Sequence, residues 1–222
     1  MKTADREERV RMTRGKLSMT VKLATGLLVL GAWLLMIRSA AGTLSDTGVR
    51  SLRYFTVLSN FLCGIAAILH FCFLAIRKSA PRWVLRLSYA GTVAVGVTLM
   101  VVLLFLGPLY GYPAMLKGAN LWFHLLIPLL AILDHILLEP GERPSFGDTF
   151  LCLISPFLYG IGYAVNIAAN GIGKWPDTND WYLFFYWGVP VGIAIYAAIL
   201  LLAWGIALTL RALGRKRAKR EA

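Results

Sequence analysis

Polar side chains are few within the long apolar runs of this sequence, and two of them are the types needed for a hydrolase. Thr56 lies at the start of one apolar run, and His124 lies five residues inside another. A threonine hydroxyl is unreactive at its own pKa, but a neighbouring imidazole can take its proton and make it a nucleophile. The pair therefore predicts acyl transfer, provided that the fold brings the two residues together.

The depth of each residue in a membrane supports this pairing. An α-helix advances about 1.5 Å per residue, so Thr56 lies about 5 Å beyond Arg53, and His124 lies about 9 Å beyond Gly118. Both depths are measured from the same face of the membrane, so contact is possible. Pro128 has no N–H to bond the carbonyl of His124, which leaves a polar spot beside the imidazole. We predict Thr56 as nucleophile and His124 as general base.

A polar stripe continues along the helix that carries Thr56. Ser59, Asn60 and His70 recur at helical spacing on the same face, and polar groups in lipid turn toward the protein interior. A tetrahedral intermediate carries a negative oxygen that needs hydrogen-bond donors. Ser59, Asn60 and Asn120 are the candidate donors for this oxyanion or for the substrate.

A second polar group lies toward the opposite face of the membrane, where His70, Asp134 and His135 approach the ends of their runs. Asp134 is the one carboxylate inside a run, and it stands ten residues from His124, about 15 Å along a helix. It therefore cannot orient that imidazole as the third member of a triad. We predict that Asp134 has a structural role and pairs either with a basic residue of 77–86 or with His70.

The elements that must position these residues are membrane-spanning helices. Of the 222 residues, 58% are hydrophobic and 15% are charged, which excludes a soluble globule. A spanning helix needs about 20 apolar residues. The sequence predicts an all-α membrane protein, a bundle of six transmembrane helices near residues 23–41, 54–76, 84–106, 119–138, 149–170 and 182–210. Residues 188–192, with two glycines around Pro190, predict a kink and close helix packing in the last span.

The distribution of charge predicts topology and domains. Alternate segments outside the spans hold 18 and five of the Lys and Arg residues, so the positive-inside rule places both termini in the cytoplasm. The predicted parts are a basic leader (1–22), the transmembrane domain (23–210) and a basic tail (211–222). The net charge of +12 is therefore explained by topology and anionic lipid, and we expect no nucleic-acid partner. Six aromatic residues predict an interfacial belt on the outer side: Tyr110, Tyr112, Trp122, Trp175, Trp181 and Tyr182.

The residues around the two candidate catalytic positions resemble a known family. Residues 54–60 (YFTVLSN) opening a second span, followed by His124, Pro128 and Leu133-Asp134 in a fourth, resemble the androgen-induced family of six-span membrane proteins and its bacterial relatives. This resemblance implies a threonine hydrolase that cleaves fatty-acid esters of hydroxy fatty acids with one Thr and one His. It assigns Thr56 as nucleophile and His124 as base, with membrane lipids as partners and the bacterial cell membrane as location.

Two other functions remain open on the sequence. A small-molecule or proton-coupled transporter would use the stripe from Thr56 to His70 together with Asp134 and His135, and a non-catalytic membrane scaffold would need none of these residues. Metal, nucleotide and common hydrolase motifs such as H-E-x-x-H and G-x-S-x-G are absent from the sequence. We therefore expect no metal and no cofactor.

Overall fold

The computed structural model describes residues 2–38, 48–77, 79–139, 144–174 and 178–221, and helices form its regular structure. Six helical segments are long and apolar enough to cross a membrane: Met12–Arg38, Phe55–Arg77, Arg82–Tyr110, Ala119–Leu138, Asp148–Asn170 and Val189–Arg215. The all-helical, six-span prediction is confirmed.

The elements follow one another in a simple order. They are α1 (Lys2–Arg38), η1 (Gly48–Arg53), α2 (Phe55–Arg77), α3 (Arg82–Val101), η2 (Val102–Leu106), α4 (Gly107–Tyr110), α5 (Tyr112–Met115), α6 (Ala119–Leu121), η3 (Trp122–Leu126), α7 (Ile127–Leu133), η4 (Asp134–Leu138), α8 (Asp148–Leu151), α9 (Ile154–Asn170) and α10 (Val189–Glu221). Helix α1 runs without a break from the basic leader into the first span.

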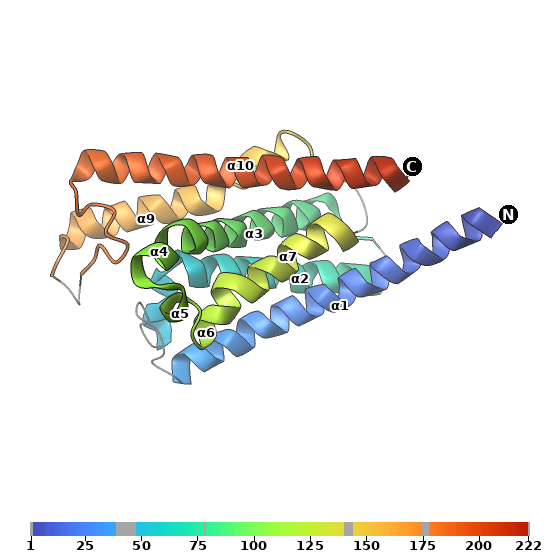
Figure 1. The fold of residues 1–222 in the computed structure, drawn as a ribbon, viewed down its shortest axis with the longest axis horizontal. Coiled ribbons are helices and arrows are strands. Elements are labelled where there is room, and N and C mark those ends of the chain that lie inside the picture. The colour runs from blue at the N-terminus through green and yellow to red at the C-terminus, as the bar shows by residue number, and fades with distance from the viewer. Residues whose placement is uncertain (1, 39–47, 78, 140–143, 175–177, 222) are drawn as a thin grey trace.

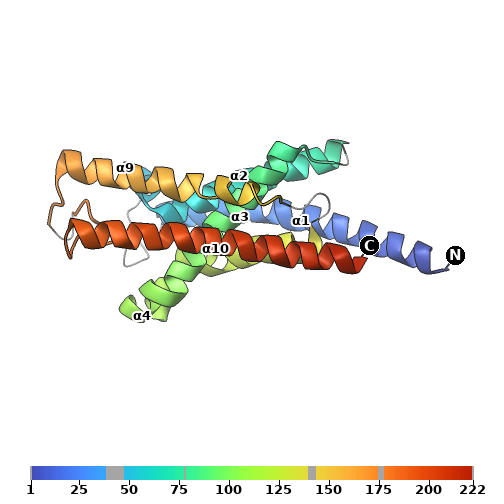
Figure 2. The ribbon, with the colours of Figure 1, turned by 90° about the horizontal axis from the view of Figure 1, so that it is seen from above.

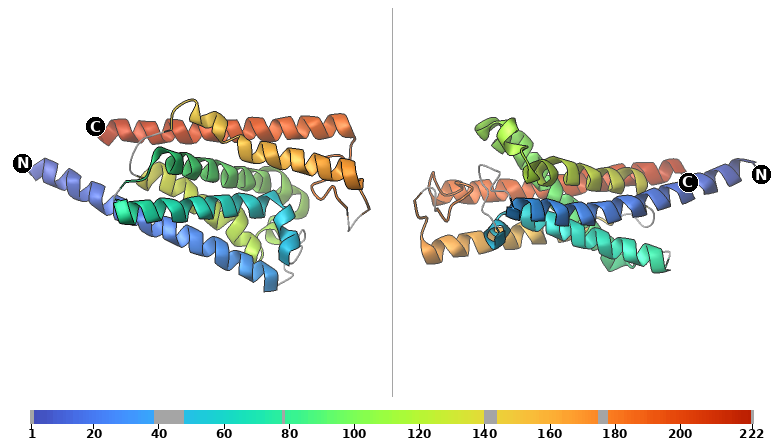
Figure 3. Two further views of the ribbon diagram at one scale, coloured as in Figure 1. Left: turned by 180° about the vertical axis from the view of Figure 1, so that it is seen from behind. Right: turned by 90° about the horizontal axis from the view of Figure 1, so that it is seen from below.

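The central helix of the bundle is α3, which contacts α2, α7 and α10. Figure 1 shows α9 and α10 together on one side of it, and α1 and α7 on the other. Seen from above, α4 projects to one side of the bundle (Figure 2). Both termini lie at the same end in every view (Figure 3), and we call this the basic end. The opposite end, which holds η1 and residues 178–188, is called the aromatic end.

Small residues allow the central helix to pack closely. Tyr89, Val93 and Val97 of α3 are buried against Ala203 and Ala207 of α10. Because lipid tails are as apolar as these side chains, close van der Waals packing rather than the hydrophobic effect holds membrane helices together. A second core cluster joins α1, α2, η3 and the aromatic end, and includes Val29, Val57, Phe123 and Trp181.

Three wide helical turns interrupt the third and fourth spans. In these π-type turns a backbone N–H bonds the carbonyl five residues earlier, as Gly107 does to Val102, Ile127 to Trp122, and Glu139 to Asp134. Each turn ends two residues before a proline in the sequence: Pro108, Pro128 and Pro140. A proline has no N–H and clashes with the carbonyl four residues earlier, so the turn ahead of it widens. At Pro128 the sequence predicted a freed carbonyl and a polar spot beside His124, and the structure forms a wide turn at Trp122–Leu126.

The last span differs from its prediction at its N-terminal end. Residues 182–188 form turns, and α10 begins at Val189. Gly188 takes a φ of 94°, which only glycine adopts without strain, and Pro190 then stands in the first turn of the helix, where its missing N–H has no helical partner to lose. The predicted kink is wrong, because this motif starts a helix instead of bending one.

Candidate functional site

An apolar cavity of about 190 Å³ lies among α2, α3, α9, α10 and the turns of the aromatic end. Aliphatic and aromatic side chains form its walls, including Val97, Val101, Phe184 and Ile193. Thr56 lines this cavity near the start of α2. Thr56, the predicted nucleophile, therefore borders a space that is suited to a hydrocarbon chain.

Five of the six hydroxyl-bearing residues on this cavity have hydrogen-bond partners. Tyr159 donates to the Arg53 carbonyl, Tyr163 to Asp180, Tyr196 to the Phe157 carbonyl, Tyr182 accepts from the Phe55 N–H, and Thr98 bonds Ser59. Thr56 is the exception, because its hydroxyl makes no hydrogen bond within the described part of the chain. A threonine in a membrane helix usually bonds the carbonyl four residues earlier, and Thr56 does not.

His124 is buried inside the wide turn η3, with 6% of its surface exposed. Its Nδ1 lies 2.7 Å from the carbonyl oxygen of Met115. A carbonyl only accepts, so Nδ1 carries the hydrogen and the neutral ring has its lone pair on Nε2. That nitrogen has no hydrogen-bond partner in the described ranges. His124 thus has the tautomer that a general base requires.

The structure brings the surroundings of Thr56 and His124 together, but it forms no hydrogen bond between the two side chains. Asn60 donates to the carbonyl of Thr56 at 2.7 Å and to the carbonyl of Phe123, the neighbour of His124, at 3.1 Å. Asn60 therefore links α2 and η3 at the level of both residues. His124 itself does not line the cavity that holds Thr56.

The three candidate oxyanion donors differ in their hydrogen bonding. Asn60 uses both amide hydrogens on backbone carbonyls, and Ser59 bonds the Thr56 carbonyl at 3.1 Å and Thr98 at 2.9 Å. Asn120 is buried, and its side-chain amide makes no hydrogen bond in the described residues. Asn120 is therefore the candidate that keeps a free donor.

The turns at residues 180–185 cover the cavity, and the sequence analysis did not find this role. The Asp180 carboxylate accepts hydrogen bonds from the Tyr163 hydroxyl and from the N–H groups of Phe184 and Phe185. Burial raises the pKa of Tyr182 to about 12, so its hydroxyl keeps its hydrogen near neutral pH. Trp181 is 8% exposed, so it packs in the core instead of joining the predicted belt. Trp175, also predicted for the belt, lies outside the described residues.

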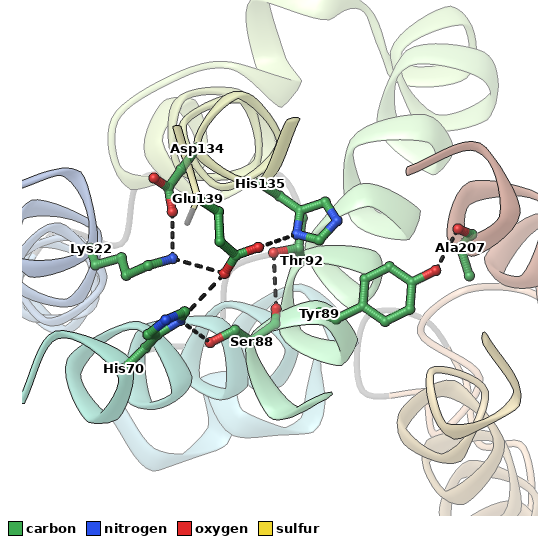
Figure 4. A network of polar contacts seen from close by, with 9 residues as sticks. All are labelled: Lys22, His70, Ser88, Tyr89, Thr92, Asp134, His135, Glu139 and Ala207. Carbon is green, nitrogen blue, oxygen red and sulfur yellow. Dashed lines mark hydrogen bonds and ion pairs between the residues drawn. The ribbon is translucent and has the colours of Figure 1, made fainter. Parts of the chain in front are cut away.

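A second polar cluster lies toward the basic end (Figure 4). Lys22 Nζ of α1 is 2.6 Å from Asp134 Oδ2 and 3.1 Å from Glu139 Oε1. The same Glu139 carboxylate faces His135 Nδ1 at 2.5 Å and His70 Nδ1 at 3.3 Å. We call these five residues the ion cluster.

The predicted partner of Asp134 is wrong, because its cation comes from the first helix. Lys22 was counted with the leader, although α1 carries it into the bundle, where 4% of it is exposed. Glu139 was not predicted either, since it follows the predicted end of the fourth span. Burial would raise the pKa of the Glu139 carboxyl, but Lys22 and His135 together hold it well below its usual range.

Two asparagines near the C-terminal end of α9, Asn166 and Asn170, have a local role. Asn170 donates to Asn166 at 2.9 Å on the same helix, so this hydrogen bond does not join two helices.

The described residues contain no group of His, Cys, Asp and Glu side chains that could hold a metal ion. In comparisons with known proteins, no family model, curated protein or solved structure matches this chain.

Proposed function

We propose that the protein is an intramembrane hydrolase of lipid esters, with Thr56 as nucleophile and His124 as general base. One observation carries the proposal: of the hydroxyls lining the apolar cavity, that of Thr56 has no hydrogen-bond partner among the residues that the structure describes. A hydroxyl kept unbonded against a hydrocarbon-lined space suits attack on an ester whose acyl chain occupies that space.

The mechanism is acyl transfer in two steps. Thr56 Oγ1 attacks the ester carbonyl while His124 Nε2 takes its proton, and the protonated imidazole then gives that proton to the departing alcohol. An acyl-threonine ester remains. Water attacks it with His124 again as base, and the fatty acid leaves as the threonine regains its proton. The amide of Asn120, which has no hydrogen-bond partner among the described residues, is our candidate donor to the oxyanion.

We propose that the hydrogen bond between the side chains of Thr56 and His124 forms when substrate binds. Catalytic hydrogen bonds are often long or absent without substrate and tighten in the reacting complex. Asn60 bonds the backbone carbonyls of Thr56 and Phe123, so it holds these two backbone segments together, and the approach of the two side chains is left to substrate binding.

The interior between the two polar sites supports hydrolysis over transport. Cys63 continues the α2 stripe between Asn60 and His70, and it packs in a buried cluster with Val95 and Ala131. These three residues form a small apolar cluster between the Thr56 region and the ion cluster. A transporter needs a polar pathway through that depth.

Covalent labelling tests the proposal. A fluorophosphonate probe reacts with activated hydroxyl nucleophiles, and we expect mass spectrometry of the purified protein to locate the adduct on Thr56. Thr98 lines the same cavity and is the matched control, so Thr98→Ala should still be labelled whereas Thr56→Ala should not. Labelling that is unchanged in Thr56→Ala would reject Thr56 as the nucleophile.

We also propose that both termini face the cytoplasm of a bacterial cell membrane, with the aromatic end outside. The structure places the termini at one end, and the excess of Lys and Arg lies there. After Cys63, Cys72 and Cys152 are replaced by Ala, a membrane-impermeant maleimide should label Lys174→Cys in intact cells. It should label Ala218→Cys only after permeabilisation, and the reverse pattern would invert the topology.

A further inference from the structure

A long groove lies between α2, α3 and α9, and its volume is about 980 Å³. Its walls are mainly aliphatic and come from one face of each helix, with Leu58 and Leu62 on α2, Leu87 on α3, and Ile154 and Leu158 on α9. Leu58, Ile154 and Leu158 are exposed, so in a membrane the groove faces lipid. Sites for small molecules usually have volumes of about 300–1,000 Å³, so the groove has room for a bound lipid chain.

The length of the groove matches one leaflet of a bilayer. On α9 its lining extends from Ile154 to Asn166, which is twelve residues, or about 18 Å of helix. Half of the hydrocarbon core of a bilayer is about 15 Å thick. One acyl chain of one leaflet can therefore lie along the groove.

Aromatic side chains separate this groove from the cavity that holds Thr56. Phe55, Tyr159 and Tyr163 line both spaces. The rings of Phe55 and Tyr159 lie 5.2 Å apart, and the Tyr159 hydroxyl donates to the Arg53 carbonyl at 2.7 Å, which holds that ring in place. The groove is therefore a second apolar space, distinct from the proposed hydrolase cavity.

The two ends of the groove carry different cations. At the aromatic end, Arg53 is half-buried, and its guanidinium lies over the rings of Tyr54 at 5.2 Å and Trp181 at 5.0 Å. It also donates to the Tyr54 hydroxyl. At the basic end, Arg86 lines the groove with 42% of its side chain exposed. Of these two cations, Arg86 is the one that a ligand in the groove can reach.

Arg86 is fixed in place by a buried carboxylate. Its Nε donates to Asp148 Oδ1 at 2.8 Å, and the Asp148 side chain is 7% exposed. The other oxygen of Asp148 accepts from the N–H of Ser145 at 2.7 Å and from its hydroxyl at 2.8 Å. The Nη1 and Nη2 groups of Arg86 make no hydrogen bond with the residues that the structure describes. This edge of a guanidinium matches two oxygens of a phosphate.

The residues beside Arg86 place it near the level of lipid headgroups. Trp83 lines the same end of the groove and is 53% exposed, and tryptophan concentrates at the interface between membrane and water. Trp83 and Arg86 stand three residues apart, which is about 5 Å along α3. Arg82, also exposed, begins this helix, where unbonded N–H groups give a partial positive charge. This corner of the bundle therefore attracts an anion.

We propose that the groove binds one anionic phospholipid from the leaflet at the basic end of the bundle. The phosphate accepts hydrogen bonds from Nη1 and Nη2 of Arg86, and one acyl chain lies between Leu87 and Leu158 and extends toward the aromatic end. A headgroup that carries an amine is disfavoured, because the amine would lie beside Arg82 and Arg86. This site goes beyond the proposed hydrolase activity, which does not use the groove.

Native mass spectrometry of the full-length protein in detergent tests the proposal. The delipidated protein is titrated with dioleoyl phosphatidylglycerol, dioleoyl phosphatidylcholine or dioleoylglycerol, which share their acyl chains. We expect one phosphatidylglycerol to bind at least about tenfold more tightly than the other two lipids, because only this lipid brings a phosphate without an amine. Inorganic phosphate in excess should not displace it, since phosphate has no chain to fill the groove. Equal affinity for the three lipids, or displacement by inorganic phosphate, would overturn the proposal.

Variants locate the bound lipid. The Arg86→Gln/Asp148→Asn double variant removes both charges of the pair, so the net charge is unchanged, and it should weaken phosphatidylglycerol binding by about tenfold or more. Leu158→Trp fills the groove without touching the pair and should weaken binding similarly, so it decides the question if the double variant does not fold.

The matched controls change exposed residues elsewhere. Lys16→Gln removes a charge from α1, and Leu201→Trp adds the same bulk to α10, where Leu201 is 66% exposed. Both should bind phosphatidylglycerol within about twofold of the unmodified protein. Unchanged binding in Leu158→Trp, or an equal loss in Leu158→Trp and Leu201→Trp, would show that the lipid does not occupy the groove.

Discussion

Alanine at Thr56 or at His124 is expected to reduce lipid-ester hydrolysis by about a thousandfold or more. Without Thr56 the acyl chain has no nucleophile, and without His124 the hydroxyl keeps its proton. Because both residues act in one step, the double variant should be no less active than either single variant. Thr56→Ser keeps the hydroxyl and should retain measurable activity. The assay is release of fatty acid from a detergent-solubilised ester, normalised to folded protein.

The control for this series lies on the same cavity. Thr98→Val preserves the shape of the side chain and removes a hydroxyl that bonds Ser59, so it should change turnover by less than about tenfold. Folding of each variant is checked by size-exclusion chromatography. Additive losses in the Thr56→Ala/His124→Ala protein would mean that the two residues act separately and that the dyad is wrong.

Replacement of Lys22 by methionine should lower the free energy of unfolding by about 3–5 kcal/mol, because it leaves two buried carboxylates without their cation. Lys16→Met removes the same charge from an exposed position of α1 and should have little effect. The Lys22→Met/Asp134→Asn double variant removes both members of the closest pair and should recover part of the loss. These differences in the free energy of unfolding are measured by titrating each detergent-solubilised variant with a denaturing detergent.

Hydrolysis provides the second readout for this cluster. Asp134→Asn should weaken the fold while leaving turnover per folded molecule within about a fewfold, because Asp134 stands about 15 Å along the helix from His124. A well-folded Asp134→Asn protein that has lost activity by several orders of magnitude would show that catalysis takes place at the ion cluster.

The sequence predicts the six spans well, because long apolar runs bounded by charge leave few alternatives in a membrane. It also predicts compatible depths for Thr56 and His124, since depth follows from counting residues along a helix. It does not show which way each side chain turns. In the structure Thr56 lines the cavity, whereas the ring of His124 bonds the carbonyl of Met115. His124 lies within the wide turn η3, which the sequence did not predict.

The partners of Asp134 illustrate the other limit of sequence reasoning. Lys22 stands 112 residues earlier in the chain, at a point where the basic leader and the apolar run meet. Charge counting assigns such a lysine to the membrane surface, whereas the continuation of α1 carries it inward. One signal in the sequence pointed to Lys22. A carboxylate inside a span needs a cation at the same depth, and Lys22 is the last basic residue before the first apolar run.

The wide turns have a consequence for insertions and deletions in this chain. A π-type turn holds about one residue more than an α-helical turn, and each residue of an α-helix rotates the chain by about 100°. Loss of a single residue from Trp122–Leu126 would let that turn close and would rotate the rest of the fourth span about its own axis. Asp134 and His135 would then turn away from Lys22 and Tyr89, even though every side chain of the ion cluster was still present. The fourth span is therefore expected to tolerate changes of residue type in this turn better than changes of its length.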